Sequence, residues 1–334
     1  MRVLGCCLIL AGIPAVAREN VDRIILFPKL YVGQIIRYQI GYRATSNTNT
    51  ESSVAAPMAP TGGQANAIIF LQVEVEDLRQ DAGETLARLR TSIIDPAPVS
   101  PNATAPANGA STNNPSASAA QDAKDAAKSV QPGKVIELTL SGDGKVTDVQ
   151  GLDKLTPDER AAWQEWVARF GGGAALPQKG VRPGEKWKSN EAIPDTLLAG
   201  LSWDKQSEYV NDAPCAAMQL TPQGDPSAGH QPQDTCAVIL TSATLKQKSS
   251  ALDATPEDYK LHNLRNTGTA QGQNQIISYF SLTTGLLVRA TEDANQSMNV
   301  IVATADGSNR VQYGIQAESH SRVLLLADAP ANRP

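Results

Sequence analysis

Hydrophobic and polar residues alternate with a period of two over several stretches of the chain, and polar segments separate some of these stretches. The stretches are rich in β-branched and aliphatic residues, and they cover residues 30–43, 67–78 and 85–95. Residues 134–151 carry the same alternation on both sides of Asp143-Gly144, a pair that favours a tight hairpin turn. This period is typical of strands that bury one face of a sheet.

The C-terminal half continues the pattern. Residues 201–210 and 236–247 read as strands, and residues 274–327 read as further strands with turns at Thr284-Gly285 and Asp306-Gly307. Many strands that hairpins join in series predict an antiparallel meander. The predicted fold class is therefore mainly β: a curved antiparallel sheet, half-barrel-like, with one principal helix covering its concave face.

The helix is predicted over the residues that follow Thr156. Thr156 is a good N-cap, Pro157 fits the first helical position, and Glu159 completes a capping box. The apolar residues spaced to share one face are Trp163, Trp166, Val167 and Phe170. Three glycines at 171–173 then end the helix. Because so short a helix is marginal without packing, we expect it to lie on the sheet.

Two segments, 44–66 and 96–131, consist mainly of Ala, Pro, Ser, Thr and Asn. Such segments have too few large apolar side chains to offset the chain entropy lost on ordering. We therefore predict disordered insertions at both places. The strands on either side look like parts of one sheet, so residues 18–334 are predicted to form a single domain.

Residues 1–17 are predicted to be a signal peptide. Arg2 precedes an apolar run from Val3 to Ile13, and Ala15-Val16-Ala17 gives a small-residue cleavage site. The mature protein is therefore expected to be exported, to the periplasm or the extracellular space. We expect no lipidation at Cys6, because no hydrophobic region precedes it in this sequence; a translation start further upstream would leave lipidation open.

Composition narrows the function classes. The net charge is -5, and no cluster of Lys and Arg that could neutralise phosphates is present, so nucleic acid is not an expected partner. Removal of the leader leaves Cys215 and Cys236, an even pair that predicts a disulfide in an exported protein. His230 is the only histidine between them, and we expect no metal site.

Two short motifs match parts of enzyme signatures. Ser202 and Lys205 fit Ser-x-x-Lys, and Tyr209 and Asn211 fit Tyr-x-Asn, as in penicillin-recognising serine enzymes. Those enzymes draw the two motifs from a helix start and a distant loop, whereas here both lie on one predicted strand, and no Lys-Thr-Gly follows. We therefore predict no catalytic residues, no enzyme activity and no cofactor.

A set of loose motifs carries a family resemblance. They are Gly33, Gln34 and Tyr38; Leu176, Pro177, Val181, Pro183, Gly184 and Trp187; and Phe280 with Gly285. Together they resemble uncharacterised secreted bacterial β-rich proteins, families of unknown function that look like outer-membrane lipoprotein carriers and related envelope lipoproteins. The resemblance implies a curved sheet with a helix over its opening, and in the carriers this opening holds acyl chains. The chain lacks a clear lipidated cysteine and an arginine that maps to the carriers, so carrier function is not transferred.

The candidate ligand-binding residues are Trp163, Trp166, Val167, Phe170 and Trp187. An apolar stripe at helical spacing is either ordinary core or the roof of a groove, and the sequence leaves both interpretations open. The first functional hypothesis is a non-enzymatic envelope protein that binds a lipid or another hydrophobic ligand under the helix. The alternative is a structural or protein-interaction module that contacts an envelope protein partner and has no small-molecule ligand.

Overall fold

The fold is built on one antiparallel sheet, seen in a computed structural model that describes residues 23–54, 59–81, 84–94, 134–142, 144–170, 176–193, 196–215 and 234–326. Eleven strands within these ranges follow the order β5-β4-β3-β2-β1-β11-β10-β9-β8-β7-β6. Their bounds are β1 Ile35–Ser52, β2 Thr61–Asp81, β3 Glu84–Ile94, β4 Val135–Ser141, β5 Val146–Gln150, β6 Lys186–Ala192, β7 Leu201–Pro214, β8 Thr235–Gln247, β9 Leu264–Ser281, β10 Leu287–Thr304 and β11 Arg310–Leu326.

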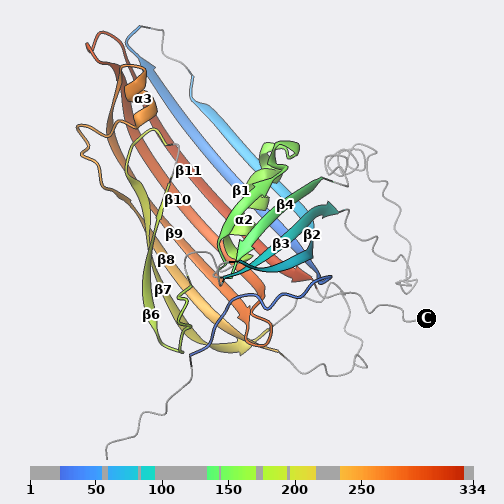
Figure 1. Ribbon diagram of the computed structural model, residues 1–334. Coiled ribbons are helices and arrows are strands. Elements are labelled where there is room, and N and C mark those ends of the chain that lie inside the picture. The colour runs from blue at the N-terminus through green and yellow to red at the C-terminus, as the bar shows by residue number, and fades with distance from the viewer. Residues whose placement is uncertain are drawn as a thin grey trace, which may run out of the picture.

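The first and last strands lie side by side in the middle of the sheet. From β1 one meander runs outward to β5, and from β11 the other runs outward to β6, so the open sheet has β5 and β6 at its edges. The chain between these edges contains the 3-10 helix η2 (Leu152–Lys154) and the helix α2 (Pro157–Phe170). Figure 1 shows α2 in the hollow of the curved sheet, with β2–β4 on one side of it. The predicted fold class is confirmed.

The start of α2 is fixed by a capping box. The Thr156 backbone N–H donates to Glu159 Oε2 at 2.8 Å, and the Glu159 N–H donates to Thr156 Oγ1 at 3.3 Å. Lys134 Nζ, directly before β4, also donates to Glu159 Oε2 at 2.6 Å. Burial raises the pKa of Glu159, but the bonds from Lys134 and Thr156 more than offset this and hold the pKa below its ordinary value.

The apolar stripe of α2 packs into the main core. Trp163, Trp166 and Phe170 are each 1% exposed or less. Trp166 and Phe170 lie 4.8 Å apart between ring centroids, and Phe170 meets Tyr38 of β1 edge to face at 5.9 Å. Trp163 Nε1 donates to Thr91 Oγ1 on β3 at 3.1 Å. This aromatic packing, together with the hydrogen bond that Trp163 donates, holds the helix against the sheet.

The prediction of disorder for residues 44–66 is wrong for most of that segment. Residues 44–52 belong to β1 and residues 61–66 to β2, and the two strands pair with each other up to Thr48–Thr61. Residues 44–52 also pair with β11 on their other side, from Ala44–Ser319 to Ser52–Val311. Backbone ladders on both sides satisfy the peptide groups, so the strand does not depend on large buried side chains.

Other predicted segments fall outside the described ranges. These are the signal peptide at 1–17, the insertion at 96–131, the glycines at 171–173 and His230.

The far end of the sheet, beyond α2, holds a small second core. Its buried members are Leu198, Leu201, Leu245, Ala254 and Val300. The short helix α3 (Glu257–Leu261) lies at this end, where β1, β9, β10 and β11 extend furthest (Figure 1). Neither α2 nor α3, nor η2, is long and apolar enough to cross a membrane.

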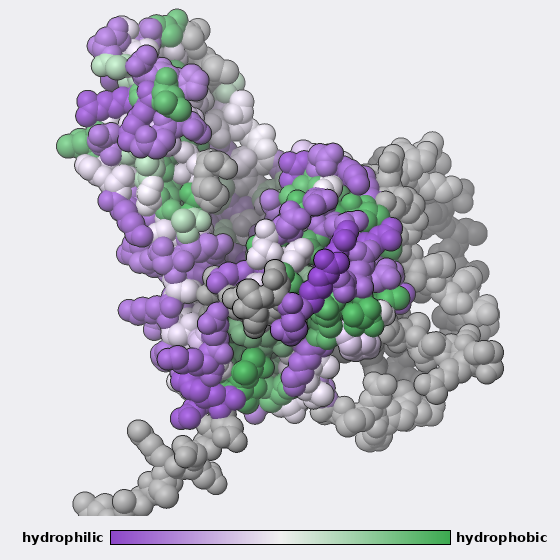
Figure 2. All heavy atoms as spheres, viewed as in Figure 1, coloured by the Kyte–Doolittle hydropathy of each residue, from purple (hydrophilic) through white to green (hydrophobic). Residues whose placement is uncertain are grey.

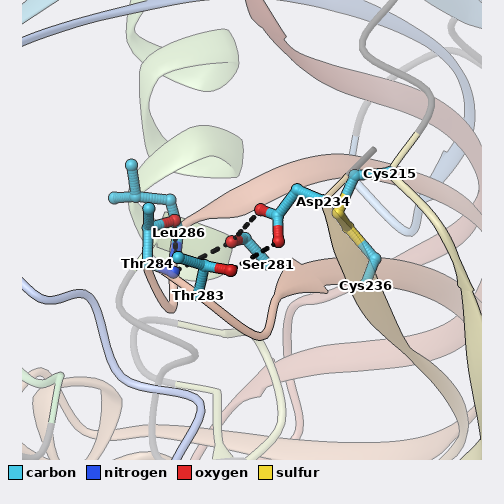
Figure 3. The surroundings of a disulfide bond; sticks show 7 residues. All are labelled: Cys215, Asp234, Cys236, Ser281, Thr283, Thr284 and Leu286. Atoms are coloured by element: carbon cyan, nitrogen blue, oxygen red, sulfur yellow. Dashed lines mark hydrogen bonds between the residues drawn. A yellow bond between two sulfur atoms is a disulfide. The ribbon is translucent and has the colours of Figure 1, made fainter. Parts of the chain in front are cut away.

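The predicted disulfide between Cys215 and Cys236 is confirmed, and it ties the end of β7 to the start of β8. Figure 3 shows Asp234 beside it, with its carboxylate turned toward the β9–β10 turn. That carboxylate accepts from Ser281 Oγ and, at 2.7 Å, from Thr283 Oγ1. The disulfide and Asp234 therefore fasten the end of β7 and the start of β8 to each other and to the neighbouring turn.

Candidate ligand-binding site

The helix does not cover the whole concave face. Its main contacts are with β1, β2, β10 and β11, and the face of β6–β9 lies to one side of it. A cavity of about 410 Å³ occupies this space, and its walls come from the second half of α2, from β6–β9 and from the β4–β5 hairpin. Both edges of the curved sheet thus contribute to one cavity, which we call the helix-side cavity.

One part of the helix-side cavity is apolar. The apolar side chains on its wall are Val146, Val167, Leu176, Trp187, Ile239, Ile276 and Phe280. Val167 and Trp187 are partly buried, and both pack against the main core. A volume of 410 Å³ falls within the range of roughly 300–1,000 Å³ that is usual for sites that take small ligands.

The rest of the wall is polar and contains hydrogen-bonding groups without partners. Ser207 Oγ and Thr241 Oγ1, both buried, bond to each other at 2.8 Å. Ser189 Oγ on β6 and Arg169 Nε on α2 are buried and have no hydrogen-bond partner among the described residues. Such orphaned polar atoms are costly when buried, so each needs an explanation.

Strand register places the polar groups in a row across the sheet. Residues directly opposite each other in antiparallel strands share one face, and the row beneath α2 reads Trp187, Ser207, Thr241, Ile276, Glu292, Ser321 and Tyr42. Two residues toward the second core, the next row contains Ser189, Lys205, Ala243 and Asn274. Two residues the other way, the row contains Tyr209, Ile239, Ser278, Ala290 and Val323. The concave face therefore changes from mainly apolar to polar beneath the helix.

A charged cluster lies at this change. Arg169, near the end of α2, contacts Glu292 of β10 and lies 3.4 Å from Glu165 Oε2, one helical turn earlier. Ser321 Oγ donates to Glu165 at 3.3 Å, and Asn274 Nδ2 donates to Glu292. The side chains of Arg169 and Glu292 are 12% and 8% exposed, so water screens this ion pair weakly.

The two carboxyl groups of the cluster differ in pKa. Burial, and then the negative charge of Glu292, raise the pKa of Glu165 to about 8. Burial also raises the pKa of Glu292, but Arg169 and hydrogen bonds from Glu165 and Asn274 more than offset this and lower it. At neutral pH, Glu165 therefore holds a proton and donates to an ionised Glu292, which is the usual outcome for neighbouring carboxyl groups.

Burial lowers the pKa of Arg169, but Glu292, Glu165 and, more weakly, Glu191 of the edge strand β6 raise it above its ordinary value. Arg169 and Glu191 line the same cavity, so this part of β6 lies near the end of α2. Glu191 itself pairs with Lys205, and both line the helix-side cavity.

A second cavity, of about 520 Å³, lies beyond the charged cluster. Its wall includes Glu165, Glu292, Asn274, Tyr42 and Trp203, together with small and polar residues of β1, β2, β10 and β11. Figure 2 shows the surface recessed between the part of the molecule that carries α2 and the elongated end of the sheet, where polar residues dominate. The charged cluster thus separates a partly apolar cavity from a polar one.

The five residues predicted to bind a ligand divide into two groups. Val167 and Trp187 line the helix-side cavity, whereas Trp163, Trp166 and Phe170 lie in the main core. Arg169, Glu165 and Glu292 were not singled out from the sequence. The spacing of Glu165 and Arg169, at i and i+4, was the only signal available, and such pairs usually lie on solvated helix faces.

No group of three or more His, Cys, Asp or Glu side chains is placed to hold a metal ion in the described parts of the chain.

No protein-family model matches the chain, and no curated protein matches it in sequence. Among solved structures, the crystal structure of a "putative lipoprotein" from Parabacteroides distasonis ATCC 8503 aligns with it. The alignment covers 91% of this chain and 98% of the other, at 8% identity and a TM-score of 0.27. A score this low carries no argument about function, and the resemblance to lipoprotein carriers stays a prediction from sequence motifs.

Proposed function

We propose that this protein is a non-enzymatic, exported envelope protein that binds a ligand with an aliphatic chain in the helix-side cavity. The observation that carries the proposal is the cavity itself: apolar side chains of α2 and β6–β9 face a volume that the helix does not fill. Burial of an aliphatic chain there would remove apolar surface from water on both sides, which contributes roughly 25 cal/mol per Å².

Two further features support this function. The cavity lies beside a helix that the aromatic core holds firmly, so its walls are preformed and a ligand need not order them. The mature chain carries a disulfide between Cys215 and Cys236, as is usual for exported proteins.

The test fills the cavity. Val167→Trp places a large ring in the helix-side cavity, whereas Gln164→Trp places the same ring on the exposed face of the same helix. A fluorescent fatty acid, titrated below its micelle concentration, should bind the wild type and the Gln164→Trp protein saturably. The Val167→Trp protein should lose most of this binding while unfolding at a similar temperature.

Failure of the probe to bind the wild type saturably would contradict the proposal and favour the alternative, an envelope module without a small-molecule ligand. Equal binding by the two Trp variants would place the probe elsewhere and would contradict the assignment to the helix-side cavity.

A further inference from the structure

The two orphaned groups on the wall of the helix-side cavity can each donate a hydrogen bond to a ligand. Arg169 Nε carries a proton and cannot accept, and Ser189 Oγ has a hydroxyl proton to give. Neither has a partner among the described residues, and each atom has almost no accessible surface, so a ligand oxygen reaches it only when its side chain turns toward the cavity. Ser207 and Thr241 bond to each other, which uses the hydroxyl proton of one of the two.

The charges near these donors are largely balanced. Arg169 pairs with Glu292, and Lys205 pairs with Glu191. A cationic head group would therefore find no unpaired carboxylate here, since Glu165 holds its proton at neutral pH. An oxygen acceptor, in contrast, would accept hydrogen bonds from donors that now have no partner. A hydrogen bond between arginine and a carboxylate is stronger than one between neutral groups.

The direction of the ligand follows from the register. Ser189 lies in the row shared with Lys205, two residues from the row of Trp187 and Ser207. The spacing of these rows is about 7 Å along a strand. Ile239 and Phe280 lie on the other side of the Trp187 row, toward the main core. A ligand with its apolar part against Ile239 and Phe280 would therefore present its other end to the row of Ser189.

We infer that the ligand of the helix-side cavity is a fatty acid, with its carboxylate bound by Ser189 Oγ and Arg169 Nε and its chain against Val167, Trp187 and Phe280. The inference rests on the proposed function and adds the head group, its position and the chemistry that selects it. A carboxylate has two acceptor oxygens, so one group can accept from both donors.

The experiment compares three ligands of equal chain length in the full-length mature protein: dodecanoate, methyl dodecanoate and dodecyltrimethylammonium. Each displaces a bound fluorescent fatty acid, and the midpoint gives its affinity. The variants are Ser189→Ala, which removes one donor, and Arg169→Lys, which keeps a cation for Glu292 but removes Nε. Ser242→Ala, on the exposed face of β8, is the matched control.

We expect the wild type to bind dodecanoate most tightly and the ammonium compound most weakly. Loss of one hydrogen bond to a carboxylate should weaken dodecanoate binding about tenfold in Ser189→Ala, with little change for the methyl ester. Ser242→Ala should match the wild type. If Arg169→Lys unfolds, Ser189→Ala, a change on an edge strand, still decides the question.

Equal affinity of the wild type for all three ligands, or unchanged dodecanoate binding in Ser189→Ala, would overturn the head-group assignment and leave the proposed function standing. If the fluorescent fatty acid itself does not bind the wild type, the proposed function fails, and the inference fails with it.

Discussion

Ionisation of Glu165 should destabilise the protein as the pH rises, and Glu165→Gln should remove this loss. The groups that face Glu165 are Arg169 on its own helix, Glu292 on β10, Ser321 on β11 and Tyr42 on β1. Glutamine resembles the protonated carboxyl group in shape and has no charge. The variant should therefore keep the contacts that protonated Glu165 makes and should not titrate.

The sign follows from the raised pKa. The pKa of Glu165 is about 8 in the folded protein, against an ordinary value of 4.5. The folded state thus holds this proton more tightly than the unfolded chain does, and the stabilisation is complete below about pH 4.5. It is lost as the pH rises and is gone above about pH 8.

The size of the effect follows from the same two values. Each pH unit between them corresponds to about 1.4 kcal/mol, which sets an upper limit of roughly 5 kcal/mol. The Glu165 side chain keeps 25% of its surface exposed, and water there stabilises the ionised form. We therefore expect a loss of roughly 2–3 kcal/mol in the free energy of unfolding, because partial exposure raises the effective dielectric constant.

The assay is urea unfolding at a series of pH values from about 5 to 9, followed by the fluorescence of the buried tryptophans. We expect Glu165→Gln to become more stable than the wild type as the pH rises. The difference between their free energies of unfolding should level off above about pH 8. Glu318→Gln, at an exposed position on β11, is the control and should follow the wild type. Parallel curves for Glu165→Gln and the wild type would refute the raised pKa and the shared proton.

Two further predictions concern the frame around the site. Gly285→Ala should destabilise the protein by several kcal/mol, because φ is +68° and a Cβ would overlap the backbone carbonyl of Phe27. Gly307→Ala has a similar φ with open space around it, so it should lower the thermal unfolding temperature far less. Reduction of the Cys215–Cys236 disulfide should lower the free energy of unfolding by about 3 kcal/mol in the loop-entropy model, and unchanged urea unfolding with and without reductant would contradict this.

Local signals in the sequence predicted the elements that local chemistry determines. The Thr156 and Glu159 capping box, the apolar stripe of α2 and the turns at Gly285 and Gly307 each depend on neighbouring residues, and each is present in the structure. The same reasoning failed for residues 44–66. These residues include few large apolar side chains. Backbone hydrogen bonds to β2, which is close in the sequence, and to β11, which is distant, hold the described part of the segment in the sheet instead.

The site could be predicted only in part, because it depends on register. That Ser189, Thr241 and Glu292 share the concave face follows only when many strand pairings are known. A shift of one residue in any of these pairings would turn a side chain to the other face. Trp163 and Trp166 are predicted from the sequence as candidate ligand contacts, and in the structure both lie in the main core.

The central claim, that the helix-side cavity binds an aliphatic chain, is tested most directly by native mass spectrometry of protein purified after export. The wild type and Gln164→Trp should each carry a bound species whose extracted mass is that of a fatty acid, and Val167→Trp should carry none. A wild-type protein that shows only its unliganded mass, even after incubation with fatty acid, would contradict the claim, as would retention of the same species by Val167→Trp.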